Sequence, residues 1–291
     1  MARYSYWEQN DHSRLAALKQ HPLFTDHLLP DIEGGEVFPA IRKKKIDFYH
    51  VGRKLFSFDG KRFRSNIAYL VAYQNAPNGE VTEPAFKELK LCESFYEGYP
   101  QIKKNTKLYA EPESEQVARM WNSHSCFKKS NSGPIVVLDI ELSLKALDED
   151  RNQDRIDLVL LHLKERRIRF VEVKTFRNKE LWPSPDGQIE VVGQIARYKK
   201  QIKQNPLLVS DYCQYVRLLF KLFGVKLLEP QAIDVDVDLL VTGYTGTDEQ
   251  KIKASLLPAF GDTFRTNHRG NLSNTSQNAL AKWWGNRKQS R

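Results

Sequence analysis

The two stretches Arg155-Ile-Asp-Leu-Val-Leu-Leu-His-Leu163 and Arg167-Ile-Arg-Phe-Val-Glu-Val-Lys-Thr-Phe176, with the turn Lys164-Glu165-Arg166 between them, decide the fold of this chain. Both are rich in β-branched and other apolar residues, and a short polar turn between two such runs is typical of an antiparallel hairpin. Ile135–Leu144 has the same character. These segments therefore predict a three-stranded meander.

Segments with the spacing of amphipathic helices precede and follow the meander in the sequence. The apolar residues within 114–126, 188–204 and 207–223 recur at helical intervals, and Ile233–Gly243 alternates as a further strand does. The order α-β-β-β-α-α-β predicts an α/β protein with a mixed central sheet flanked by helices.

Three charged side chains interrupt the apolar meander. Because side chains alternate across a strand, Glu172 and Lys174 share one face while Val171 and Val173 share the other. The hairpin brings Asp157 beside Glu172 on the neighbouring strand. Two carboxylates and an ammonium in an apolar sheet are costly to leave without partners, which favours a site over a chance arrangement.

A hard divalent cation would relieve the repulsion between the two carboxylates. Mg²⁺, or Mn²⁺, takes oxygen ligands, usually one or two carboxylates with water and a substrate phosphate. Asp157 and Glu172 are therefore the candidate metal ligands, and Lys174 would orient a water molecule or neutralise charge on a phosphodiester. The alternative is an edge strand with a solvated charged face, because Val-Glu-Val-Lys alone fits that description as well.

Asp157, followed by Glu172-Val173-Lys174 on the next strand, resembles the PD-(D/E)xK nuclease superfamily. Gln194-Ile-Ala-Arg-Tyr198 on the following helix is similar to the Gln-xxx-Tyr motif of its RecB-like branch. The resemblance spans roughly residues 112–242 and implies a restriction-endonuclease-like core, α-β-β-β-α-β, with one extra helix here. The proline that often precedes the first Asp of the family is absent.

The resemblance also implies roles for individual residues. The main-chain carbonyl of Val173 would add a metal ligand, as would an acid on the first core helix, for which Glu115 is the best match and Glu113 the alternate. Gln194 with Tyr198 would contact a nucleic-acid backbone or brace the catalytic lysine. The implied catalytic set is Asp157, Glu172, Lys174, Gln194 and Tyr198.

Other acidic residues are weaker candidates. Asp139 and Glu141 share a strand face and are held in reserve as residues near the metal. Asp234, Asp236 and Asp238 alternate on the last strand, where one polar face of an edge strand is favoured over a second acidic site.

Residues 1–110 predict a small, basic α+β region built on a β-meander. The expected elements are a helix over 13–20, a loop over 30–39, strands over 45–50, 54–58 and 62–73, and a helix over 84–96.

The hairpin of this region carries a run of basic residues with aromatic residues between them. Such a pattern suits phosphate contact and base stacking, which makes the region a candidate nucleic-acid interface. The alternative is that the aromatic residues form the local core. The candidate binding residues are Arg42, Lys43, Lys44, Lys45, Arg62 and Arg64.

Composition limits the class of protein. The 291 residues carry 45 Lys and Arg against 36 Asp and Glu, a net charge of +9, which favours polyanionic partners. The three cysteines form no CxxC pair, and no Gly-rich phosphate loop is present. The first ten residues have no apolar segment, so neither secretion nor membrane insertion is expected, and a cytoplasmic location fits best.

Together these observations predict a nucleic-acid-positioning region over 1–110, a nuclease core over 111–262 and a basic tail without acidic residues over 263–291, which either adds contacts or is a flexible end. The expected function is metal-dependent hydrolysis of DNA, in repair, recombination or anti-phage defence. RNA is an alternative substrate, and a separate helicase or ATPase subunit is a candidate partner. The alternative function is a non-catalytic nucleic-acid-binding or partner-binding module on the same fold.

Overall fold

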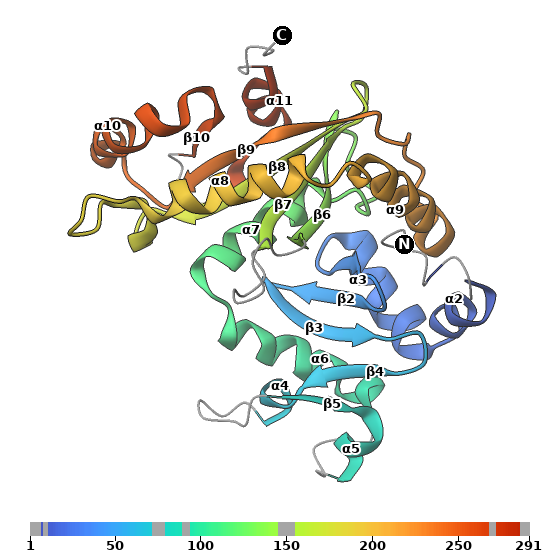
Figure 1. Ribbon diagram of the computed structural model, residues 1–291. Helices are drawn as coiled ribbons and strands as arrows, with labels where there is room; N and C mark the ends of the chain where they lie inside the picture. Colours follow the sequence, from blue (N-terminus) through green and yellow to red (C-terminus); the bar gives the residue numbers. More distant parts are fainter. Residues whose placement is uncertain are drawn as a thin grey trace. The chain divides into compact units, whose positions relative to one another are not determined.

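The chain folds into two compact units, each with its own five-stranded sheet (Figure 1). The computed structural model describes residues 7, 11–71, 79–88, 94–144, 155–267 and 272–285. The first unit comprises Met1–Ser130 and Cys213–Leu227, and the second Asn131–Tyr212 and Leu228–Arg291. The division thus falls at residue 130, whereas the sequence placed a boundary near 110, and the predicted tail belongs to the second unit.

The first unit contains the predicted antiparallel meander, in the order β1-β2-β3-β4-β5. Val51 and Gly52 turn the chain between β2 and β3 with positive φ angles of 48° and 77°, and Gly60 does so between β3 and β4 with 95°. Its strands are β1 (Phe38–Ile41), β2 (Ile46–His50), β3 (Arg53–Phe58), β4 (Phe63–Asn66) and β5 (Glu80–Thr82).

Aromatic side chains form the core of this unit. Phe48, Phe56 and Phe58 have no exposed surface, and each ring centroid lies within 6.2 Å of that of Phe63. The aromatic residues of the basic hairpin are therefore packed against one another. Of the two alternatives, the structure supports the local core and not base stacking, because rings buried in this way are not accessible to a nucleic acid.

Helices complete the first unit, and α6 packs against β3 and α4. The helix predicted over 13–20 is confirmed, as is the one over 114–126. The helical segments are α2 (Asp11–Lys19), η1 (Leu23–Leu28), α3 (Leu29–Gly34), α4 (Ile67–Val71), α5 (Glu83–Glu88), α6 (Phe95–Thr106), η2 (Lys107–Tyr109) and α7 (Pro112–His124). The long helix α9 (Leu208–Phe223) contributes residues to both units.

Two predictions for this region are wrong in part, and a third falls partly outside the described residues. Residues 30–39 are not one loop, because Pro30 occupies the first turn of α3, where a missing N–H costs nothing, and the helix ends at Gly35 with φ 84°. The strand over 62–73 ends at Asn66, whose side-chain oxygen accepts from the Ala68 amide as α4 begins. The helix predicted over 84–96 includes residues 89–93, which lie outside the described ranges. The structure has α6 from Phe95 to Thr106, where the sequence predicted no helix beyond residue 96.

The second unit confirms the predicted mixed sheet. The strand order is β10-β9-β8-β7-β6; β6, β7 and β8 pair antiparallel, whereas β8, β9 and β10 pair parallel. Its strands are β6 (Ile135–Ser143), β7 (Arg155–His162), β8 (Arg167–Thr175), β9 (Ala232–Thr242) and β10 (Phe264–Asn267).

Helix α8 lies along this sheet and packs against β9 (Figure 1). The helix predicted over 188–204 is thereby confirmed, whereas α10, α11 and β10 were not predicted. The helical segments are η3 (Lys179–Leu181), α8 (Glu190–Lys203), η4 (Gly246–Asp248), α10 (Glu249–Phe260), η5 (Gly261–Thr263), η6 (Leu272–Asn274) and α11 (Gln277–Gly285).

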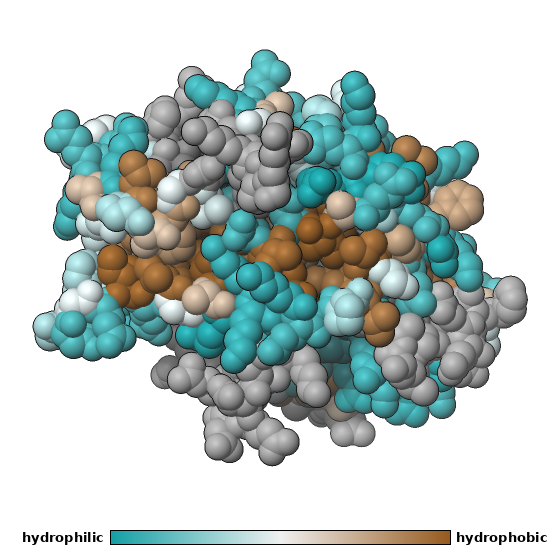
Figure 2. All heavy atoms as spheres, turned by 45° about the horizontal axis from the view of Figure 1, so that its top comes forward, coloured by the Kyte–Doolittle hydropathy of each residue, from teal (hydrophilic) through white to brown (hydrophobic). Residues whose placement is uncertain are grey.

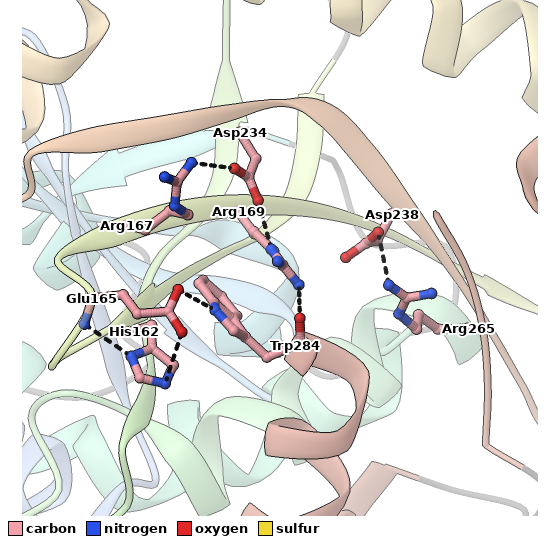
Figure 3. A network of polar contacts seen from close by, with 8 residues as sticks. All are labelled: His162, Glu165, Arg167, Arg169, Asp234, Asp238, Arg265 and Trp284. Carbon is pink, nitrogen blue, oxygen red and sulfur yellow. Dashed lines mark hydrogen bonds and ion pairs between the residues drawn. The ribbon is translucent and has the colours of Figure 1, made fainter. Parts of the chain in front are cut away.

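The C-terminal helix α11 is held to the hairpin β7–β8 through Trp284 (Figure 3). The Arg169 guanidinium lies 4.1 Å from the Trp284 ring centroid and donates to its carbonyl (2.8 Å) and to the Asp234 carboxylate (2.6 Å). The Trp284 indole N–H donates to Glu165 (2.8 Å). Residues 277–285 are thus part of the folded unit, so the flexible-end alternative is wrong for them.

Hydrophilic residues cover much of the molecular face in Figure 2, with hydrophobic residues visible among them. Large exposed apolar side chains include Leu108, Leu228 and Leu257. Single exposed apolar residues are common in folded proteins and identify no docking surface by themselves. Within the described ranges, no helix combines the length and the apolar composition that crossing a bilayer requires.

Replacing Trp284 by Ala should loosen the C-terminal helix. The change removes a side chain that is 6% exposed together with its cation–π and hydrogen-bond contacts, and should lower the free energy of unfolding by about 3–5 kcal/mol. Trp283→Ala, at the neighbouring and less buried tryptophan, is the matched control and should cost clearly less. Urea unfolding and limited proteolysis of the C-terminal segment measure both, and equal effects would contradict the docking of α11 through Trp284.

Candidate active site

The pairing of β7 with β8 brings Asp157 and Glu172 together. The antiparallel register pairs Leu158 with Val171, and its continuation by one residue places Asp157 opposite Glu172. Directly opposite residues of an antiparallel pair lie on the same face of the sheet. The Val173 amide donates a hydrogen bond to the Asp157 carboxylate (2.7 Å), which fixes that side chain against β8.

The Asp157 carboxylate lies in an environment that disfavours its charge. Burial raises its pKa well above the ordinary value, and the neighbouring carboxylates of Glu172 and Glu141 raise it further. The Val173 amide and the Lys174 ammonium act in the opposite direction and do not compensate. The folded protein therefore favours the protonated, neutral form of Asp157 more than the unfolded chain does.

Lys174 lies between two carboxylates in the interior of the unit. Its Nζ is 3.0 Å from Glu172 Oε1 on the same strand and 2.7 Å from Glu180 Oε2 on η3. The Glu172 and Lys174 side chains are 2% and 7% exposed, so this is a buried ion pair, not a solvated strand face. The alternative of a charged edge strand is wrong, because β8 is paired on both sides.

Two carboxylates at this position fit the usual protein contribution to a Mg²⁺ site, in which water and substrate phosphate supply the remaining oxygens. The raised pKa of Asp157 also fits, because a cation would stabilise its charged form. Within the described part of the chain, no group of three or more His, Cys, Asp or Glu side chains has the arrangement of a metal site. Asp157 and Glu172 are only two such side chains, so their role as metal ligands stays a prediction.

Gln194 and Tyr198 connect α8 to the start of β7. The Gln194 side-chain amide donates to the Tyr198 hydroxyl (2.8 Å), which donates to the Arg155 carbonyl (2.7 Å), two residues before Asp157. Tyr198 has no exposed surface, so its side chain braces β7 in this structure and is not accessible to a nucleic acid. A nucleic-acid contact by Gln194 stays a prediction.

The reserve candidate Glu141 lies opposite Asp157 on the other side of β7. The register between β6 and β7 pairs Ile140 with Leu158 and Leu142 with Ile156, and Glu141 between them has a φ of 48°. The backbone of a residue other than glycine is strained in this left-handed conformation. Its carboxylate lies 3.1 Å from the Arg155 guanidinium, so it forms an ion pair at the edge of the site.

The other reserve candidate, Asp139, is fully buried. It accepts hydrogen bonds from the Ile140 amide (2.8 Å) and, at 3.5 Å, from the Tyr212 hydroxyl. These contacts give it a structural place beside α9.

The alternating aspartates of β9 form ion pairs with separate basic groups. Asp234 binds Arg167 and Arg169, Asp236 lies 3.0 Å from Lys199, and Asp238 lies 3.6 Å from Arg265. These separate pairs argue against a second acidic site. The prediction of an edge strand is wrong, because β9 is paired with β8 on one side and with β10 on the other.

The predicted acid on the first core helix belongs to α7 of the first unit. There Glu115 forms an ion pair with Arg119 (2.5 Å), one turn later on the same helix. A role for Glu115 or Glu113 at the metal, and for the Val173 carbonyl, stays a prediction.

The predicted basic residues lie on the turn between β1 and β2 and on the turn between β3 and β4, except Arg64, which lies in β4. Lys43, Lys44 and Arg62 are exposed. Lys45 lies 3.1 Å from Asp47, and Arg64 lies 3.7 Å from Asp59. Arg42 is partly buried, and its carbonyl accepts from the Trp7 indole (2.7 Å). Phosphate contact by these basic residues stays a prediction. Base stacking by the aromatic residues of the hairpin is excluded, because their rings are buried.

Sequence reasoning missed Glu180. It lies six positions after Lys174 beyond the end of the strand, in a short 3₁₀ turn, and such a spacing across a loop predicts no contact. The three-dimensional path of the loop alone brings its carboxylate to the Lys174 ammonium.

No protein-family model, curated protein or solved structure matches this chain. The interpretation of the site therefore depends on the residues and contacts described above.

Replacing Asp157 by Asn should stabilise the protein in EDTA at neutral pH. Because the folded pKa of Asp157 exceeds the unfolded one, its contribution to stability is fully present below the ordinary Asp value and is lost as the pH rises through the raised value. Asn does not ionise and so keeps its contribution at every pH. Thermal melting between pH 4 and 8 measures the difference.

Mg²⁺ should raise the melting temperature of the native protein and leave that of Asp157→Asn nearly unchanged, so that the native protein becomes the more stable of the two. The control is Asp236→Asn, which removes the same charge from a side chain that is 46% exposed. A native protein that melts above Asp157→Asn in EDTA and is unaffected by Mg²⁺ would show that the carboxylate pair is not a cation site.

Proposed function

We propose that the second unit carries the centre of a metal-dependent nuclease of the PD-(D/E)xK type, which hydrolyses phosphodiester bonds in DNA. The observation that carries this proposal is the grouping of the partly buried Asp157 with the buried ion pair of Glu172 and Lys174 on β7 and β8. Buried like charges are unfavourable for stability, and groups with strongly shifted pKa values are concentrated at functional sites.

The order of elements supports a restriction-endonuclease-like core. Helix α7 precedes the strands β6, β7 and β8, then α8 and α9, and β9 completes the sheet beside β8. This is the order α-β-β-β-α-β with α9 as the extra helix. The assignment of α7 to the first unit departs from a core that is contiguous in sequence.

The chain's own residues would act as follows. Asp157 and Glu172 would hold the metal, which when bound supplies positive charge for activating water and stabilising the phosphodiester in transition. Lys174 would orient the attacking water or neutralise charge developing on the phosphate. The Val173 amide keeps Asp157 in place, and Tyr198 keeps the start of β7 in place through Arg155.

The alternative is a nucleic-acid-binding or partner-binding module without catalysis. It is favoured by one observation, the ion pairs of Lys174, which neutralise much of the local negative charge without a metal. A separate helicase or ATPase subunit and a cytoplasmic location stay predictions.

Purified protein should cleave linear, circular or single-stranded DNA with Mg²⁺ or Mn²⁺ and lose this activity in EDTA. Lys174→Ala, Asp157→Asn and Glu172→Gln should each lower the cleavage rate by about 10²- to 10³-fold. The effects of the single variants should not add in double variants, since the residues act as one unit. The control is Lys199→Ala, a lysine of α8 that pairs with Asp236.

Lys174→Ala leaves the buried Glu172 carboxylate and the partly exposed Glu180 carboxylate without this partner and should cost about 3–5 kcal/mol of stability. Rates are therefore compared below each melting transition, and Lys174→Arg tests the role of charge alone. DNA binding without cleavage in any metal would support the non-catalytic alternative. Full cleavage by Asp157→Asn would contradict the proposed centre.

Neutralising the three exposed cations of the first-unit turns, with Lys43→Gln, Lys44→Gln and Arg62→Gln together, should weaken DNA binding most at low salt. For every side chain among them that binds a phosphate, the slope of log affinity against log salt should become shallower by about 0.9. The charge-matched control is Lys19→Gln, Lys104→Gln and Lys107→Gln, three exposed lysines of the same unit. Equal slopes for the two triple variants would remove this surface as the specific binding site.

A further inference from the structure

Glu180 contacts the amine that the proposed chemistry uses. Its Oε2 lies 2.7 Å from Lys174 Nζ, closer than Glu172 Oε1 at 3.0 Å. The Glu180 side chain is 29% exposed and that of Lys174 is 7% exposed. Lys174 is thus held from two sides, by a carboxylate of its own strand and by one from the loop that follows.

The loop that carries Glu180 is tied down at several points. The Asn178 side chain accepts from the Glu180 amide (2.8 Å) and caps η3, and Leu181 has no exposed surface. The Trp182 indole donates to the Phe176 carbonyl (3.2 Å), with the two ring centroids 5.2 Å apart. A short turn with these contacts presents the Glu180 carboxylate in one position.

The two carboxylates have different tasks. Glu172 lies opposite Asp157 and would share its oxygens with a cation, whose positive charge repels the ammonium of Lys174. Glu180 contacts the same ammonium from a separate element, beyond the end of the strand. It supplies a partner for the ammonium that does not depend on the oxygens of Glu172.

We propose, on the basis of the proposed nuclease function, that Glu180 is a positioning residue which holds Lys174 in place when a divalent cation binds Glu172. The ion pair with Glu180 lets the ammonium release Glu172 without leaving the site. Glu180 thereby favours cation binding and keeps Lys174 oriented toward the reacting phosphate.

The test is Glu180→Gln, which removes the charge and keeps the size, with Glu180→Asp as the conservative variant and Glu190→Gln as the control. Glu190 is an exposed acid at the start of α8 in the same unit, and its replacement removes the same charge. Two quantities are measured on the full chain: the Mg²⁺ concentration at half of the melting-temperature shift, and kcat and KM for DNA cleavage.

Glu180→Gln should raise the Mg²⁺ midpoint, because the attraction of the ammonium to Glu172 is no longer shared. At saturating Mg²⁺ it should lower kcat by about 10- to 100-fold, because the ammonium loses one ion-pair partner that holds it in place, with KM little changed. Glu180→Asp should recover part of kcat. Glu190→Gln should match the native protein in both measurements.

Equal Mg²⁺ midpoints and equal kcat for Glu180→Gln and Glu190→Gln would overturn the proposal. So would a decrease of kcat that follows the melting temperature, because Glu180 would then have only a structural role. If the native protein cleaves no DNA, the nuclease proposal fails, whereas the melting midpoint still tests the effect of Glu180 on the cation. A Mg²⁺ midpoint unchanged by Glu180→Gln would then reject that effect as well.

Discussion

The antiparallel pairing of β7 with β8 is the constraint on which the rest of the second unit depends. It places Asp157 opposite Glu172 and puts Lys174 on the same face of a strand with neighbours on both sides. An ionisable group inside a sheet disfavours folding unless a partner compensates it. The surrounding contacts supply partners: the Val173 amide for Asp157, and the Glu172 and Glu180 carboxylates for Lys174.

These contacts compensate only in part, and an electrostatic imbalance remains at the site. Asp157 keeps a raised pKa although an amide and an ammonium act to lower it. Apolar residues of similar volume would often be at least as stable at such a position. Groups with strongly shifted pKa values are concentrated at functional sites, and the strained backbone at Glu141 is a second departure from local stability beside the same residue.

The rest of the second unit supports the hairpin from outside. Tyr198 binds the Arg155 carbonyl at the start of β7, and Arg169 joins the C-terminal helix to β9 through Trp284 and Asp234 (Figure 3). The first unit achieves its own stability differently, through clustered phenylalanines in a small meander. Of its predicted basic side chains, Lys43, Lys44 and Arg62 are exposed, and Lys45 and Arg64 form ion pairs.

The strands β6 to β9, the helices α7, α8 and α9, and the carboxylate pair could be predicted from sequence because they follow from periodicity, whereas α6, α10, α11 and β10 were not predicted. The alternation of Val171-Glu172-Val173-Lys174 and the short turn after Leu163 determine the faces and the hairpin without further information. The short helix around Pro30 was missed, because Pro in a first helical turn looks the same as Pro in a loop.

Only the tertiary structure decided the contacts between elements that are distant in sequence or lack periodicity. The burial of Phe48 and Phe56 was undecided, because a ring suits a core and a base equally well until its neighbours are known. The docking of Trp284 and the contact of Glu180 with Lys174 depend on the path of loops, which local pattern does not encode. Sequence thus determined which charged side chains share a strand face, and the folded chain decided which groups hold them.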